Sequence, residues 1–161
     1  MNDELILHAV DLEKADFSGV RPRYLDIGVG STLTRCDFSG IRPAGPPTFG
    51  SGAEPTTYVE CTFDRMPIEG GGAGRASFLR CSFLGVVIKD YRFADSQFTD
   101  CRFSGDLAAV IFSARPSLGF ALRERNAFRG NDFSVAQLRD VDFRQGVDLH
   151  WQRLLQGRST L

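Results

Sequence analysis

The sequence contains few of the residues from which enzyme sites are usually built. Its 161 residues include only two histidines, His8 and His150, at opposite ends of the chain, and neither has a nucleophile paired with it in a recognisable motif. A catalytic triad is therefore not predicted. No Walker A motif occurs, and Gly28-Val-Gly30 lacks the third glycine of a dinucleotide fingerprint. We therefore predict no catalytic residue and no cofactor, and we expect the protein not to be an enzyme.

Long apolar runs and a dominant charge are also absent. The longest apolar run, Leu107–Phe112, is far below the roughly 18 residues of a membrane-spanning helix. The acidic start Met1-Asn-Asp-Glu is unlike a signal peptide, which begins with basic residues. We therefore expect a cytoplasmic protein without a membrane segment. A net charge of −1 and the lack of a basic stripe between exposed aromatics argue against direct nucleic-acid binding.

What the chain does contain is a repeat of five residues. Ten of its 14 phenylalanines fall in one class when the chain is counted in fives: Phe38, Phe63, Phe78, Phe83, Phe93, Phe98, Phe103, Phe128, Phe133 and Phe143. A strand or a helix would spread them over all classes, because their side-chain periods are 2.0 and 3.6 residues. A small or modest apolar residue stands two positions before each aromatic, as Cys81 does before Phe83. A chain that turns a corner every five residues meets this pattern, and four corners close a coil of about 20 residues.

Five segments carry the clearest form of the repeat: Lys14-Ala-Asp-Phe-Ser-Gly19, Arg35-Cys-Asp-Phe-Ser-Gly40, Asp100-Cys-Arg-Phe-Ser-Gly105, Gly130-Asn-Asp-Phe-Ser134 and Asp140-Val-Asp-Phe-Arg144. Over about residues 10–146 the sequence resembles the pentapeptide-repeat family, whose pattern is Ala-(Asp/Asn)-(Leu/Phe)-x-x. The resemblance implies an all-β fold, a right-handed quadrilateral parallel β-helix with the Phe and Leu side chains stacked on its axis. This chain differs from the pattern by favouring Phe at the centre and often Cys before it.

The coil of twenty residues is also visible in the spacing of the aromatics. Two sets recur at intervals of twenty, first Phe38, Tyr58, Phe78 and Phe98, and then Phe63, Phe83 and Phe103. Because stacked coils lie one strand spacing apart, about 4.8 Å, each set is predicted to form a ladder along one wall. Ala15–Pro22 recurs as Cys36–Pro43, offset by 21 residues, which indicates two neighbouring coils with a one-residue bulge.

The four cysteines occupy the inward slot for small residues. They are Cys36, Cys61, Cys81 and Cys101. Parallel Cβ vectors on one wall hold the sulfur atoms of adjacent coils in a poor geometry for a disulfide. No CxxC or Cys/His spacing suggests a metal. We interpret them as reduced core thiols, with a redox role and a metal site as the less favoured alternatives.

Two stretches interrupt the repeat within the single domain predicted over residues 1–147. The first, near 43–55, is so rich in proline and glycine that it predicts an extruded loop. The second, near 113–125, would place Arg123 on the axis, which burial forbids without a partner. We predict a second excursion there that contacts another protein through Arg115, Leu118, Phe120, Arg123 and Arg125. The alternative is a loop that folds back to cover the wall of the β-helix.

The last segment, residues 148–161, departs from the five-residue period. Asp148–Gln156 predicts a short helix capped by Asp148 and ended by Gly157. Its apolar side chains are Leu149, Trp151, Leu154 and Leu155. We expect this helix to cover the last coil, because an open end exposes core side chains and unpaired backbone. Its long apolar stripe slightly favours a homodimer joined through it.

These features predict a protein-binding module. The pentapeptide-repeat resemblance implies one particular partner, a type II DNA topoisomerase such as gyrase. Family members of this type bind the topoisomerase and protect it against quinolones or toxins. Some of them imitate duplex DNA when they bind. Such imitation needs a strongly negative face, whereas arginines alternate with acids here, as in Asp64-Arg65 and Asp100-Cys-Arg102. The alternative is a structural, scaffold or immunity-type role with an unrelated protein partner.

Overall fold

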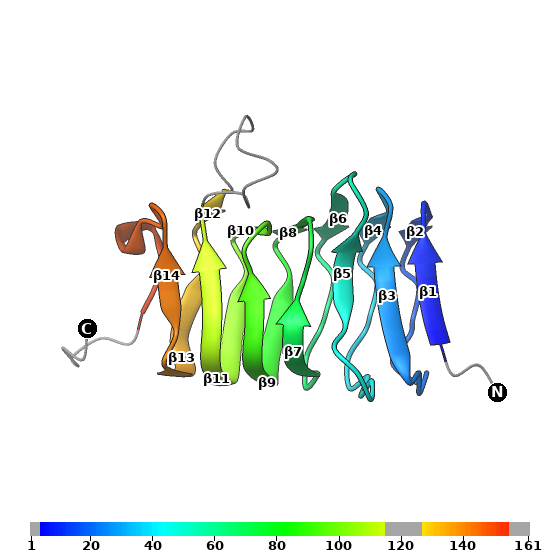
Figure 1. Cartoon of the computed structure of the whole chain (residues 1–161), viewed down its shortest axis with the longest axis horizontal. Coiled ribbons are helices and arrows are strands. Elements are labelled where there is room, and N and C mark those ends of the chain that lie inside the picture. Colours follow the sequence, from blue (N-terminus) through cyan, green and yellow to red (C-terminus); the bar gives the residue numbers. More distant parts are fainter. Residues whose placement is uncertain (1–3, 115–126, 155–161) are drawn as a thin grey trace.

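The computed structural model describes residues 4–114 and 127–154, which form an all-β structure of parallel sheets. Strands β1 to β14 stand side by side along the long axis, from one end to the other (Figure 1). The first sheet contains β1 (Glu4–His8), β3 (Tyr24–Gly28) and β5 (Thr48–Ser51). The second contains β2 (Asp11–Glu13), β4 (Thr32–Thr34), β6 (Thr56–Val59), β8 (Ala76–Leu79), β10 (Gln97–Thr99) and β12 (Phe128–Arg129). The third contains β7 (Pro67–Gly72), β9 (Ser82–Phe93), β11 (Arg102–Ser113), β13 (Asp132–Arg139) and β14 (Asp142–Arg144), which pairs with β11.

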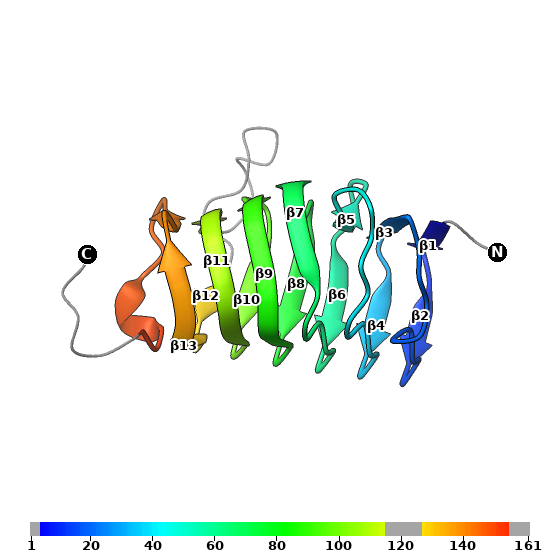
Figure 2. The same ribbon diagram turned by 90° about the horizontal axis from the view of Figure 1, so that it is seen from below.

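Each strand pairs with the strand that follows it by one coil. In the second sheet the register runs Leu12↔Leu33↔Tyr58↔Phe78↔Phe98↔Phe128, always in parallel. Figure 2 shows this sheet and the third sheet from another side, with their strands in the same order along the axis. Residues alternate between inward and outward positions because successive side chains of a strand point to opposite faces. This arrangement is consistent with a β-helix.

The aromatic rings form columns inside the structure. One column runs through Phe17, Phe38, Phe63, Phe83, Phe103 and Phe133, with successive ring centroids 4.5–5.2 Å apart and nearly parallel planes. A second stacks Tyr58, Phe78 and Phe98 at 4.8 Å. The two columns meet edge to face, as for Phe78 and Phe83 at 5.4 Å and 70°, which is the favourable geometry for aromatic pairs. Nine of the ten phenylalanines of the repeat are buried, and the tenth, Phe143, packs half-buried on this core. The prediction that these rings point inward is confirmed.

The prediction that Phe38 belongs to the column of Tyr58 is wrong. Phe38 stacks on Phe63, at 5.2 Å, and Tyr58 pairs in register with Leu33. Phe38 and Phe63 are 25 positions apart, so the coil between them holds five residues more than the coil from Phe63 to Phe83. The later rings keep the interval of twenty, as Phe63, Phe83 and Phe103 do, so only Phe38 lies in another column than predicted.

The segment near 43–55 is not an extruded loop. It contains β5, and Phe49 within it is fully buried. The Phe49 ring contacts the ring edges of Tyr58 and Phe63. The segment also supplies two acceptors, because Tyr58 Oη donates to Phe49 O at 2.5 Å and Tyr91 Oη donates to Pro47 O at 2.6 Å. A buried tyrosine hydroxyl needs such a partner, so this segment fills and completes the core.

Many corners of the coils use left-handed backbone. At one corner the residues Lys14, Arg35, Glu60, Arg80 and Asp100 have φ between 52° and 58°, one in each coil. Non-glycine residues enter this region at a cost of about 1–2 kcal/mol each. The stacking of the coils therefore has to hold these corners in place, and their charged side chains are directed to the surface.

The C-terminal segment is not the predicted helix from Asp148 to Gln156. The only helical element within the described residues is the three-residue 3-10 turn η2 (Leu149–Trp151), in which the Asp148 side chain accepts from His150 N. The chain then becomes extended: Arg153 bridges to Asp132, and Leu154 packs on the core beside them. Trp151 is 60% exposed. A three-residue turn is too short to present an apolar stripe, so the described residues contain no helix that could join two copies. Leu155 lies outside the described residues.

Candidate binding surfaces

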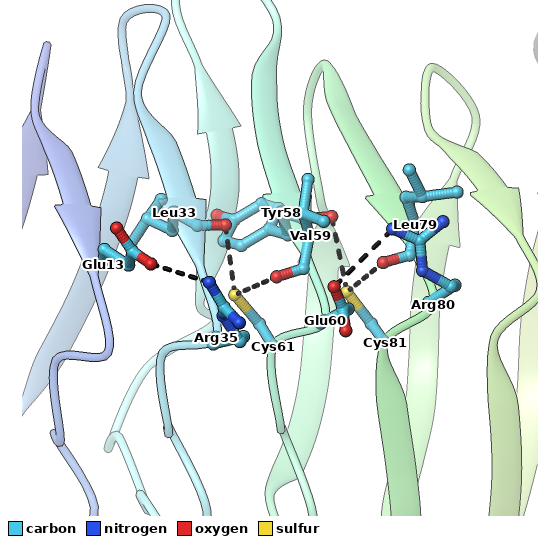
Figure 3. Close-up of polar contacts among 10 residues, drawn as sticks. All are labelled: Glu13, Leu33, Arg35, Tyr58, Val59, Glu60, Cys61, Leu79, Arg80 and Cys81. Atoms are coloured by element: carbon cyan, nitrogen blue, oxygen red, sulfur yellow. Dashed lines mark hydrogen bonds and ion pairs between the residues drawn. The ribbon is translucent and has the colours of Figure 1, made fainter.

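The interior holds a ladder of thiols along the second sheet. Each cysteine sulfur donates to a backbone carbonyl of the preceding coil, Cys61 to Leu33 O at 3.3 Å and Cys81 to Tyr58 O at 3.5 Å (Figure 3). Cys36 and Cys101 repeat the pattern with Leu12 O and Phe78 O. All four cysteines are buried and none forms a disulfide, so the prediction of reduced, buried thiols is confirmed.

These thiols are expected to resist modification until the protein unfolds. Burial raises the pKa of the Cys81 thiol and that of the Cys36 thiol, so their nucleophilic thiolates are scarce at neutral pH. The hydrogen bond with Cys81 lowers the pKa of the Cys61 thiol, so the protection of Cys61 rests on the burial of its side chain. An aromatic disulfide reagent should find no reactive thiol in the native protein at pH 8 and four in denaturant. Rapid labelling of native Cys61, Cys81 or Cys101 would contradict the ladder.

Two amides extend the thiol ladder toward the C-terminus, and the sequence pattern alone did not identify them. Asn131 Nδ2 donates to Phe98 O at 3.0 Å, and Gln152 Nε2 donates to Phe128 O at 2.7 Å. Gln152 Oε1 in turn accepts from Asn131 N and Nδ2. Both amides are buried, so Gln152 anchors the last segment to the coil before it.

Replacing Gln152 with alanine should loosen this last segment. The change leaves Phe128 O and the Asn131 backbone N–H without their partners, which costs roughly 1–3 kcal/mol for buried groups. Urea denaturation and amide exchange of residues 149–154 would measure the loss. The control is Gln137→Ala, because Gln137 is exposed on β13. Equal stability of the two variants would contradict the anchoring role.

The outer walls carry mixed charges. Along the corner of the second sheet, Arg35 pairs with Glu13 at 2.7 Å and Arg80 lies 3.6 Å from Glu60 (Figure 3). The side chains of these pairs are about half exposed. Such pairs contribute little to stability, but they neutralise the wall. The alternation that the sequence showed therefore persists in space, and this corner is not a continuous anionic strip.

One hollow lies on the surface of the third sheet, over β7, β9 and β11. It has a volume of about 340 Å³ and is lined by Gly71, Asp90, Tyr91, Arg92, Ala109 and Ile111. The hollow is open to solvent, and its charged groups, Asp90 and Arg92, have no partner nucleophile or second carboxylate among the lining residues. Within the described ranges, no group of three or more His, Cys, Asp and Glu side chains is placed to hold a metal ion.

The predicted contact residues Arg115, Leu118, Phe120, Arg123 and Arg125 lie outside the described residues, and their role stays a prediction. β11 ends at Ser113, and the chain returns at Ala127, whose N–H donates to Gln97 Oε1 at 3.1 Å. Phe103 and Phe133 stack although they are 30 positions apart, so this coil has ten residues beyond twenty. Of the C-terminal set, Leu149 and Leu154 are half-buried and Trp151 is exposed.

No family model matches the sequence, and no curated protein matches it. The solved structures that align with it include two trypsin-treated variants of QnrB1, a plasmid-mediated fluoroquinolone resistance protein. One is 14% identical, with a TM-score of 0.30, and the alignment covers 89% of this chain and 80% of that chain. The other is 15% identical, with a TM-score of 0.19 and coverage of 88% and 92%.

In the part of the chain that the structure describes, no helix has the length and apolar character that crossing a membrane would require.

Proposed function

We propose that this chain is a non-catalytic, right-handed quadrilateral β-helix of the pentapeptide-repeat type that acts in the cytoplasm as a protein-binding module. The observation that carries the proposal is the filled interior. Ring columns and the thiol ladder occupy the axis, and residues such as Phe83 and Phe98 are fully buried. Substrate sites are usually concave apolar pockets with a few convergent polar groups. A packed axis leaves the outer walls, the corners and the ends for function.

Affinity capture tests this function. The protein, immobilised through a terminal tag, is incubated with a lysate of its native host, and the retained proteins are quantified. We expect one or a few proteins at near-stoichiometric amounts. The control is the same resin without the protein. Retention of no protein above that control would contradict the proposal.

A type II DNA topoisomerase such as gyrase is the particular partner that we propose to test first. Its support is the resemblance of the repeats to the pentapeptide-repeat family. The paired charges Glu13–Arg35 and Glu60–Arg80 argue against imitation of duplex DNA, so binding would use individual side chains and the apolar ends. A supercoiling assay with gyrase and a quinolone, with and without the protein, is the test. Protection of the supercoiling activity is expected; its absence removes this partner and leaves the general proposal intact.

The second candidate is a scaffold or immunity-type role with an unrelated protein partner. The near-neutral corner of the second sheet favours it. The DNA channel of a topoisomerase is expected to attract a strongly negative surface, whereas a neutral wall is better suited to contact an uncharged protein surface. Identification of a partner other than a topoisomerase in the capture experiment distinguishes this role from the first.

A further inference from the structure

Arg21 and Arg42 occupy equivalent positions in two neighbouring coils. The pairing and the turn bonds before the arginines have an offset of 21 residues. Before the arginines, Asp16 bridges to Asp37. The turn bonds next to the arginines repeat at the same offset, from Val20 N to Phe17 O at 3.0 Å and from Ile41 N to Phe38 O at 3.4 Å. The two arginine backbones therefore lie about one strand spacing apart, roughly 4.8 Å.

Neither arginine has a counter-charge among residues 4–114 and 127–154. Arg21, Arg23 and Arg42 are exposed, and no carboxylate of the described residues lies within ion-pair distance of them. Like charges at directly opposite positions of neighbouring strands destabilise a sheet. The Arg35 guanidinium on the second sheet, in contrast, has Glu13 at 2.7 Å.

The carboxylates of the turns before the arginines are already used locally. Asp16 Oδ1 accepts from Ser18 N and Ser18 Oγ, at 2.9 and 2.6 Å. Asp37 Oδ1 accepts from Ser39 N at 2.9 Å. These bonds close the turns, and the bond from the Ser18 hydroxyl lowers the pKa of Asp16. Asp16 and Asp37 are therefore engaged within their own turns. The guanidinium groups of Arg21 and Arg42 remain available to bind another molecule.

A flat aromatic side chain stands beside the arginines. Tyr24 is 50% exposed, and the Arg23 guanidinium carbon lies 5.9 Å from its ring centroid. The ring packs over Gly45, where an added Cβ would lie 3.3 Å from Tyr24 Cε1. Pro22 and Pro43 follow the two stacked arginines, and a residue before proline is held in extended backbone. The arginine corner, defined as Arg21, Arg23, Tyr24 and Arg42, is thus a preorganised cationic and aromatic surface.

We propose that the arginine corner binds a short acidic segment of the partner protein, with carboxylates on the guanidinium groups and an apolar side chain on the Tyr24 ring. This inference rests on the proposed protein-binding function. Arginine forks match carboxylates in a bidentate manner, and the pairs are charge-assisted. The i and i+2 residues of an extended segment share a face and lie roughly 6.7 Å apart, a separation that two long arginine side chains can span from neighbouring coils.

A nucleic acid fits this surface less well. A duplex carries one negative charge per roughly 1.7 Å along its axis, and it would extend beyond the two coils that carry the arginines. On one side it would meet Glu4, which pairs in register with Tyr24. The net charge of −1 gives no long-range attraction for a polyanion. A short acidic segment can end before it reaches Glu4.

Fluorescence anisotropy with a labelled peptide tests the proposal. The probe has four glutamates followed by two leucines, and a second probe has glutamines in place of the glutamates. We expect the acidic probe to bind the wild type and the glutamine probe to bind at least about tenfold more weakly. Arg21→Gln combined with Arg42→Gln should weaken the acidic probe at least about tenfold. The control combines Arg35→Gln with Arg80→Gln, which removes the same charge from another wall and should change affinity less than about twofold.

Three outcomes overturn the proposal. The first is no binding of the acidic probe to the wild type, and the second is an equal loss of affinity in the Arg35/Arg80 control. The third is displacement of the probe by inorganic phosphate or a short oligonucleotide at a lower concentration than by the unlabelled peptide. Capture from lysate separates this failure from failure of the proposed function. If the wild type and the Arg21/Arg42 variant retain the same partner equally, the arginine corner is not the contact, although the protein still binds proteins. If the wild type retains none, the proposed function itself fails.

Discussion

Replacing Phe98 with alanine is expected to lower the free energy of unfolding by roughly 3–5 kcal/mol. The Phe98 ring is fully buried and stacks on Phe78 at 4.8 Å. It also contacts the ring edges of Phe93 and Phe112, at 5.1 and 5.5 Å. Backbone hydrogen bonds between coils hold the walls at a fixed separation, so the structure cannot collapse into the cavity. Urea denaturation monitored by circular dichroism measures the loss.

The controls for Phe98 separate cavity formation from a general effect of apolar truncation. Val135→Ala removes a side chain that is 71% exposed, and we expect a change within about 0.5 kcal/mol. Phe98→Leu keeps an apolar side chain on the axis and should lose less than Phe98→Ala. A loss below about 1 kcal/mol for Phe98→Ala would contradict the stacked core.

Gly105→Ala is expected to destabilise the protein by roughly 3 kcal/mol or more. Gly105 has a φ of +101°, and an added Cβ would lie 2.2 Å from Val86 O and 2.7 Å from Val86 N. These backbone atoms belong to the neighbouring strand β9, so the two coils would have to separate. The same denaturation experiment measures this effect.

Gly40→Ala is the matched control for Gly105. Gly40 also has a positive φ, +73°, but an added Cβ would meet nothing within 4 Å. This variant therefore reports the backbone cost alone, about 1–2 kcal/mol. If the two alanine variants lose the same stability, close packing between coils is not what requires glycine at position 105.

The phenylalanine repeat predicted the core well because each coil has to place a bulky side chain on the axis. The sequence pattern was less informative where the coil length changes. Counting in twenties placed Phe38 beside Tyr58, whereas the coil of 25 residues moves it to Phe63. Proline and glycine near 43–55 indicated a loop, but Phe49 is needed inside, where its carbonyl accepts from the Tyr58 hydroxyl.

The last coil was misread for a related reason. Leu154 follows Phe133 by 21 positions, the same offset that relates Phe17 to Phe38. It therefore falls outside the class of the repeat phenylalanines when the chain is counted in fives, although Arg153 beside it still pairs with Asp132 of the preceding coil. The adjacent leucines and the tryptophan suggested a helix. Gln152 was overlooked because a glutamine in the inward slot does not resemble a cysteine, yet its amide donates to a carbonyl of the coil before it as the thiols do. A search for amides as well as small residues in this slot would have identified it.

The most direct test of the account is an experimental electron-density map of the crystallised protein, because the proposed function depends on a filled axis. The account predicts that Phe63, Phe83 and Phe103 form one column, with ring centroids 4.9 Å apart. It also predicts reduced sulfur atoms at Cys61, Cys81 and Cys101, each directed at a carbonyl of the preceding coil. A map with these rings splayed around an internal cavity, or with a ligand on the axis, would contradict it.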